Sequence, residues 1–147
     1  VGTSGSGKTR SIVSPNILQA SGSYVISDPK GNLYKKYGNY LKRKGYKVLE
    51  RNWKYGSLEV DIIVRNKTHV VFVEVKTRSS DGLLRPEDAV DAQKQRNLTI
   101  AASHYIQQKQ CELEPRFDVV AIVWNDSRCE INHIEDAFPP QWSKRRY

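Results

Sequence analysis

The amino-acid sequence predicts an α/β fold in which a central mixed β-sheet carries helices on both sides. Three observations predict this class. Residues 58–75 form two β-rich runs around a polar break, which is typical of a β-hairpin. Residues 32–44 and 86–109 space their apolar side chains as helices do. Residues 117–134 hold two further β-rich runs joined by a short polar turn.

The opening residues, GTSGSGKT, match the phosphate-binding pattern G-x-x-x-x-G-K-[ST]. In that pattern Gly2 and Gly7 let backbone N–H groups turn towards phosphate. Lys8 would reach the β and γ oxygens of a nucleotide such as ATP, and Thr9 would hold Mg²⁺. The pattern needs a preceding strand, of which only Val1 remains, so we expect weak phosphate binding at most.

A helix is predicted over Asn32–Lys44, with Gly45 as its C-cap and basic residues at its negative end. Its apolar positions are Leu33, Tyr37, Tyr40 and Leu41. Tyr46–Trp53 then reads as a strand. A loop at residues 54–56 leads from this strand into the hairpin.

The hairpin consists of Leu58–Val64 and His69–Val75. A two-residue turn at Asn66-Lys67 would place Glu59 opposite Glu74, and Asp61 opposite Phe72. Side chains alternate across a strand. One face, from Leu58 to Val75, is apolar except for His69 and should pack on helices. The other face carries Ser57, Glu59, Asp61, Ile63, Val70, Phe72, Glu74 and Lys76.

Three carboxylates on a half-buried sheet face are costly unless something neutralises them. Mg²⁺ or Mn²⁺ would do so, because such hard cations take carboxylate oxygens and water. We expect Asp61 and Glu74 to be metal ligands, with Glu59 as an auxiliary acid. Lys76 points the same way and would orient an attacking water or offset charge on a pentacovalent phosphate. The alternative is a solvated sheet face with an ordinary Glu–Lys pair.

The remaining elements follow in order. Residues 77–85 read as a mobile loop beside the site, where Arg78 and Arg85 could touch phosphate or be ordinary loop charges. A long helix runs from Pro86 to about Lys109, with acids in its first turns. The last two strands are Phe117–Trp124 and Cys129–Ile134, with a turn at residues 125–127. In the tail, Trp142 and the basic run at 144–146 could touch nucleic acid, although a frayed terminus is the alternative.

Charge is distributed unevenly along the 147 residues. The net charge is +8, and residues 1–48 carry all of it, with nine Lys or Arg against one acid. An excess of basic residues favours a polyanion such as nucleic acid as the binding partner. The alternative is that these residues form an ordinary solvated helix face. No apolar run is long enough for a membrane span. Two distant cysteines favour a reduced, cytoplasmic setting over a disulfide or zinc site. The absence of methionine suggests a fragment or processed piece.

The pair of acids and the lysine resemble a known pattern. Asp61, followed by Glu74-Val75-Lys76, resembles the PD-(D/E)xK motif of restriction-endonuclease-like nucleases. From Tyr40 to Phe138 the chain resembles the YraN-like family of small bacterial proteins. The segments that carry the resemblance are YLKRKGYKVLERNW, LEVDII, VVFVEVKTR, DAVDAQKQR, FDVVAIV and HIEDAF. It implies a fold related to archaeal Holliday-junction resolvases.

The same resemblance adds site residues. It implies that Gln93 and Lys94 edge the active site, where with Arg78 they would contact nucleic acid. In that family a glutamate on the preceding helix joins the metal cluster, and Tyr34 stands at that position here. Glu59 would then be the partial substitute.

Residues 1–48 closely resemble the nucleotide-binding start of TraG-like coupling ATPases of type IV secretion. The second acidic motif of those ATPases has no counterpart here, so ATP hydrolysis by this chain alone is not expected. We therefore predict a partial P-loop segment at 1–31 and a nuclease-fold domain of the restriction-endonuclease type at 32–147.

The favoured function is a metal-dependent endonuclease acting on branched or structured DNA. Three alternatives remain at this point: a nucleic-acid-binding module that lost catalysis, a nucleotide-binding fragment of a secretion coupling protein, and a fusion whose halves do not cooperate. The sequence leaves the oligomeric state open, including a homodimer.

Overall fold

The computed structural model describes residues 37–79, 90–124 and 129–142, with the backbone alone at 78–79, 123–124 and 129–130. Several predictions fall outside these residues. They are the P-loop residues Gly2, Gly7, Lys8 and Thr9, the position of Tyr34, the start of the first helix, Arg85, Pro86, the turn at 125–127 and the basic run at 144–146.

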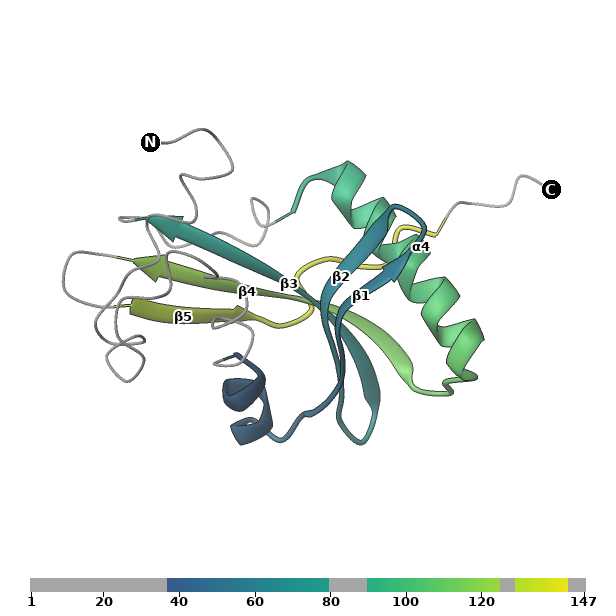
Figure 1. The fold of residues 1–147 in the computed structure, drawn as a ribbon, viewed down its shortest axis with the longest axis horizontal. Coiled ribbons are helices and arrows are strands. Elements are labelled where there is room, and N and C mark those ends of the chain that lie inside the picture. Colours follow the sequence, from purple (N-terminus) through teal and green to yellow (C-terminus); the bar gives the residue numbers. More distant parts are fainter. Residues whose placement is uncertain (1–36, 80–89, 125–128, 143–147) are drawn as a thin grey trace.

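Five strands form one mixed sheet in the order β1-β2-β3-β4-β5 (Figure 1). Strand β3 pairs parallel with β4, and every other neighbouring pair is antiparallel. This confirms the predicted mixed α/β sheet. The strands are β1 (Lys47–Tyr55), β2 (Leu58–Arg65), β3 (His69–Ser79), β4 (Glu114–Trp124) and β5 (Cys129–Ile134).

Each face of the sheet is covered by a helix, as predicted. A short helix at residues 37–43 buries Tyr37 and Leu41 on one face, and α4 (Ala92–Lys109) buries Leu98 and Tyr105 on the other. In Figure 1 the short helix, coloured dark blue, and α4, coloured green, lie on different sides of the strands. Since apolar side chains alternate along β3 and β4, both faces of these central strands are buried.

The short helix ends as predicted at Gly45. Gly45 has a φ of 90°. The Tyr46 N–H donates to the Leu41 carbonyl, and the Gly45 N–H donates to the Lys42 carbonyl. This pair of bonds satisfies carbonyls that the helix end would otherwise leave unpaired.

The predicted hairpin exists, but its register was wrong by two residues. Ile63 pairs with Phe72, and Arg65 pairs with Val70. The turn therefore lies at residues 67–68 rather than at Asn66-Lys67. The side-chain oxygen of Asn66 accepts the backbone N–H groups of Thr68 and His69, and this local bonding fixes where the chain reverses. A shift of two residues leaves the face of each side chain unchanged.

The face assignment was wrong at the start of β2. Val60 is buried with the α4 layer rather than with Ile62, and Leu58 packs at its margin. The recorded pairing of β2 with β3 runs only from Ile62 to Arg65. Before Ile62 the strand pairs with β1 alone, and the β1–β2 hairpin lies beside α4 (Figure 1).

Several element boundaries also differ from the predictions. Strand β3 continues to Ser79, although a loop was predicted from residue 77, and β4 begins at Glu114 rather than at Phe117. Strand β1 continues to Tyr55, so the turn is at 56–57 rather than 54–56. Helix α4 begins at Ala92, because the Asp91 carboxylate caps it by accepting the Lys94 N–H at 2.8 Å. Val90 and Asp91 therefore precede the helix instead of lying inside it.

Candidate active site

Two acids on the α4 side of the sheet are buried. Glu74 on β3 is 6% exposed, and Asp61 on β2 is 8% exposed. Strand alternation explains why Glu74 faces α4, because Phe72 on the same strand packs in the α4 layer. An ionised carboxylate in such a setting needs neighbouring positive charge or hydrogen-bond donors.

Two lysines supply positive charge to Glu74. The Lys94 ammonium on α4 lies 3.1 Å from Oε2, and the Lys76 ammonium on β3 lies 3.6 Å from Oε1. Glu74 Oε2 nevertheless accepts no hydrogen bond of good geometry from any described residue, although it is buried. The contact between Lys94 and Glu74 is therefore an ion pair rather than a well-aligned hydrogen bond.

Asp61 is held by the backbone of the neighbouring strand. The Val75 N–H donates to Asp61 Oδ2 at 2.8 Å. This bond ties the β2 acid to the residue that follows Glu74, so both carboxylates are presented at one place on the sheet.

The environment of Glu74 disfavours its charged form. Burial raises the pKa of Glu74 above its ordinary value, and the negative charge of Asp61 raises it further. Lys94 and Lys76 pull the pKa in the opposite direction without cancelling the rise. A carboxyl group whose pKa is raised by burial and by a second acid is typical of functional sites.

The other predicted site residues are placed differently. Glu59 is exposed on β2 and lies opposite Lys54 on β1, so the predicted pairing with Glu74 was wrong. Gln93 is exposed on α4 and accepts a hydrogen bond from Arg96 at 2.9 Å. Arg78 belongs to β3, where its backbone pairs with Val123.

The acids present fit a cation that needs few protein ligands. Mg²⁺ is commonly bound by one or two carboxylates and several waters. The buried, poorly satisfied Glu74 Oε2 and the strand-held Asp61 would be those ligands. Within residues 37–79, 90–124 and 129–142, no group of three or more His, Cys, Asp or Glu could hold a metal. The expected cluster that includes Glu59 is thus reduced there to a pair.

The sequence reasoning missed a second polar cluster on the other face of the sheet. Arg116 on β4 donates from Nε and a terminal nitrogen to the two Asp118 oxygens, at 2.8 and 2.7 Å. His133 on β5 lies 2.8 Å from Asp118, and the Asp136 N–H donates to Asp118 at 3.0 Å. Arg116 also donates to the Tyr46 hydroxyl at 2.6 Å.

A signal for this cluster was present in the sequence. Arg116 and Asp118 are two residues apart in a strand that is otherwise largely apolar, so they share a face and can pair. Hydrogen bonds from His133, Arg116 and the Asp136 backbone lower the pKa of Asp118, although burial alone would raise it. Both carboxylate oxygens of Asp118 accept hydrogen bonds from these donors. The cluster therefore holds β4, β5 and Tyr46 together.

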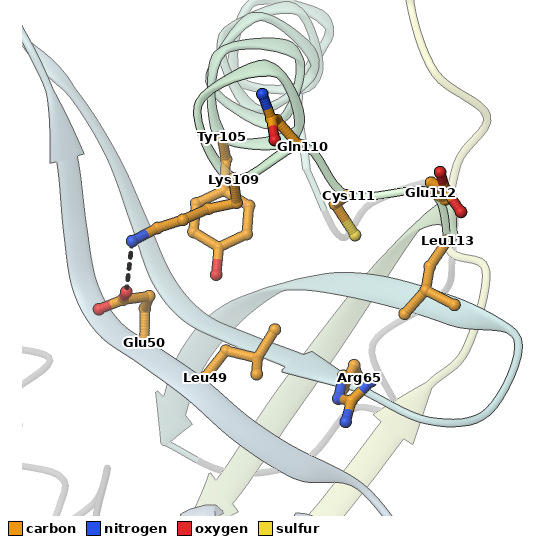
Figure 2. Close-up of a pocket in the computed structure, with 9 residues that line it drawn as sticks. All are labelled: Leu49, Glu50, Arg65, Tyr105, Lys109, Gln110, Cys111, Glu112 and Leu113. Atoms are coloured by element: carbon orange, nitrogen blue, oxygen red, sulfur yellow. Dashed lines mark ion pairs between the residues drawn. The ribbon is translucent and has the colours of Figure 1, made fainter.

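A separate hollow lies near the C-terminal end of α4 (Figure 2). It has a volume of about 480 Å³, and Lys109 pairs with Glu50 across it at 3.7 Å. None of the predicted site residues lines it. The lining residues are Leu49, Glu50, Arg65, Tyr105, Lys109, Gln110, Cys111, Glu112 and Leu113.

The fold and the site together define an α/β protein with two buried acids between its central strands and the helix that covers them. The chain belongs to the uncharacterised protein family UPF0102, whose family model matches residues 35–122. This confirms the predicted YraN-like relationship. A second model, described as type IV secretory system conjugative DNA transfer, matches residues 1–61. It covers less than half of the chain and supports only a similarity of that part.

Several bacterial relatives are described as UPF0102 proteins. The one from Parabacteroides distasonis is 46% identical over 99 residues, which is 67% of this chain and 82% of the relative. One from Porphyromonas gingivalis is 42% identical and covers 68% of this chain and 76% of the relative. One from Christiangramia forsetii is 39% identical, and the match covers 67% of this chain and 83% of the relative.

Among solved structures, Pyrococcus furiosus SfsA in complex with Ca²⁺ is 14% identical, with a TM-score of 0.32. The match covers 74% of this chain and 63% of that one. A TM-score this low supports no conclusion about fold or function. In the described part of the chain, no helix is both long enough and apolar enough to cross a bilayer.

Proposed function

We propose that this chain is a metal-dependent endonuclease of the restriction-endonuclease-like type that hydrolyses phosphodiesters in branched or structured DNA. The observation that carries the proposal is the buried pair of Asp61 and Glu74, with Lys76 and Lys94 around Glu74. The PD-(D/E)xK spacing and the family membership support the same function. The nuclease domain is proposed to span residues 32–147.

Four residues of the chain have roles in this proposal. Bound Mg²⁺ or Mn²⁺ would polarise the phosphoryl oxygen and make an attacking water more acidic. Asp61 and Glu74 would hold that ion. Lys76 would orient the water, or offset the charge that develops on the phosphorane. Lys94 would neutralise Glu74 while no ion is bound.

The test is cleavage of a four-way DNA junction, with a linear duplex for comparison, with and without Mg²⁺ or Mn²⁺. Glu74→Gln and Asp61→Asn should each reduce cleavage at least about a hundredfold, because each removes a ligand charge that stabilises the transition state. Glu112→Gln is the matched control, since Glu112 is exposed at the far end of α4. Metal-dependent cleavage that survives Glu74→Gln would refute the proposal.

A second candidate is a nucleic-acid-binding module that keeps the fold without catalysis. Two observations favour it. The described residues bring together only two acids, and Tyr34 is predicted to stand where the family has a glutamate. This candidate predicts tight junction binding without cleavage in either ion. Nucleotide binding through Lys8 and Thr9 stays a prediction, and loss of ATP affinity in Lys8→Ala is its measurement.

A further inference from the structure

The outer side of α4 gathers large apolar side chains at the surface. The exposed large hydrophobic residues of the described part of the chain are Tyr55 at 46%, Ile100 at 47% and Trp142 at 51%. Ile100 and Trp142 line the same groove beside α4, together with His104. Tyr55 stacks on His104, with ring centroids 3.8 Å apart and planes 18° apart. Residues from β1, α4 and the C-terminal segment therefore meet on one surface.

The groove has a volume of about 450 Å³, and more of its lining surface is apolar than polar, although five of its seven residues carry polar or charged side chains. The Gln141 N–H donates to Thr99 Oγ1 at 2.9 Å, which fixes the segment that carries Trp142 against α4. Arg96 supplies the formal charge of the lining, and no acid lines the groove. The lining residues are Arg96, Thr99, Ile100, Ser103, His104, Gln141 and Trp142.

We propose that this groove binds an unpaired strand of DNA, with a base stacked on Trp142 and a phosphate at Arg96. The choice of DNA rests on the proposed nuclease function. Base–aromatic stacking tolerates any sequence, because every base has a π face. The hydroxyl of Ser103 and the amide of Gln141 can hydrogen-bond to the edge of a stacked base.

The positive charge of the lining argues against a second copy of the chain as the occupant. The buried centre of a subunit interface is depleted of charged residues. Five of the seven groove residues are polar or charged, and the charge is positive. Flat apolar faces among polar edges and one cation match a nucleotide better than they match a protein core.

The groove and the candidate active site lie on different sides of α4. Arg96 follows Lys94 by two residues, which turns it about 200° round the helix axis, and Ile100 lies about 9 Å of helix rise beyond Lys94. Arg96 is oriented by its hydrogen bond to Gln93, whose amide donates in turn to Asn97 at 3.0 Å. A strand bound at both places would have to cross the first turns of α4. Gln93 would then act as a positioning residue for Arg96.

The test is the binding of a fluorescein-labelled oligothymidylate, followed by fluorescence anisotropy in EDTA so that no cleavage is involved. Trp142→Ala should weaken binding about tenfold, whereas Trp142→Phe should keep most of it, because an aromatic face remains. Gln107→Ala is the matched control, since Gln107 is exposed on α4 outside the groove. An abasic strand of equal length should bind the unchanged protein about as weakly as the oligothymidylate binds Trp142→Ala.

The outcomes separate this inference from the proposed function. Equal binding of normal and abasic strands, or unchanged binding by Trp142→Ala, would overturn the inference even where Glu74→Gln abolishes cleavage. Stacking-dependent binding without any metal-dependent cleavage would support the groove and refute the nuclease. A dimer in sedimentation that dissociates on Ile100→Asp and Trp142→Ala would assign the groove to a second copy and overturn the inference.

Discussion

Glu74 and Asp118 are both buried acids on neighbouring strands of one sheet, yet their surroundings differ completely. Asp118 accepts from Arg116, His133 and the Asp136 backbone, and its pKa is lowered. Glu74 has two lysines near it and a second acid beside it, and its pKa is raised. The difference separates an acid whose donors are built into the fold from one that is left incompletely satisfied.

This contrast suggests a way to distinguish structural from functional carboxylates. A structural acid gains stability from being charged, so the fold surrounds it with donors. A functional acid keeps lone pairs available for a ligand, and burying it with too few donors lowers the stability of the fold. Burial does not separate the two, because Glu74 and Asp118 are both nearly inaccessible.

The largest expected effect comes from removing the charge of Asp118. Asp118→Asn should lower the free energy of unfolding by about 3–5 kcal/mol, because the largely buried Arg116 loses its close carboxylate partner and keeps only the exposed Glu135 at 3.9 Å. Urea denaturation followed by circular dichroism measures the change. Glu135→Gln is the control, since Glu135 is exposed and 3.9 Å from Arg116, and it should change stability by less than about 1 kcal/mol. A similar loss of unfolding free energy in Asp118→Asn and Glu135→Gln would mean that Asp118 is not the acid that stabilises the fold.

An intermediate effect is expected at Lys94. Lys94→Met should raise the affinity of the site for Mn²⁺ about three- to tenfold, because the ammonium no longer competes for Glu74 and no longer repels the ion. Isothermal titration calorimetry measures the affinity. Lys109→Met is the matched control, because Lys109 is on the same helix but pairs with Glu50. Weaker Mn²⁺ binding in Lys94→Met would mean that Lys94 organises the ligands instead of standing in for the ion.

The smallest effect is the pH dependence of stability at Glu74. The pKa of Glu74 is raised in the folded state, so the unfolded chain releases this proton first, at about its ordinary value of 4.5. Stability should therefore fall as pH rises from 4.5 through the folded pKa. Glu74→Gln should remove this fall and be more stable near neutral pH, by less than about 1 kcal/mol.

Asp118 should give a dependence of the opposite sign. Its pKa is lowered from 3.8, so its contribution is present above 3.8 and is lost as pH falls through the folded value. Urea midpoints measured across pH for both single variants test the two slopes. The contribution of each acid is the difference in stability between the unchanged protein and its variant. If these two differences changed with pH in the same direction, the contrast between Glu74 and Asp118 would be contradicted.

Much of the fold could be predicted because local patterns determine it. The alternation along β3 and the glycine after the short helix each depend on a few neighbouring residues, and both predictions were confirmed. The hairpin register was missed because the Asn66 side chain bonds to the backbone within the turn and moves the reversal. The wrong face assignment of Val60 arose because β2 is not paired with β3 before Ile62, and Val60 packs in the α4 layer.

The candidate site divides in the same way. Burial of Asp61 and Glu74 followed from charges placed in apolar strands, whereas Glu59 does not join them because β2 pairs with β1 alone before Ile62. The Asp118 cluster was missed for a different reason. It joins β4, β5 and a tyrosine 70 residues away in sequence from Arg116, and no short window of sequence contains that set.

The parallel ladder of β3 and β4 has a consequence for how the two acids are linked. Glu74 is paired in register with Val119, and Asp118 is paired with Val73. The two carboxylates thus occupy adjacent rungs on opposite sides of the same sheet. The Asp118 cross-links therefore brace the same stretch of the β3–β4 ladder that carries Glu74.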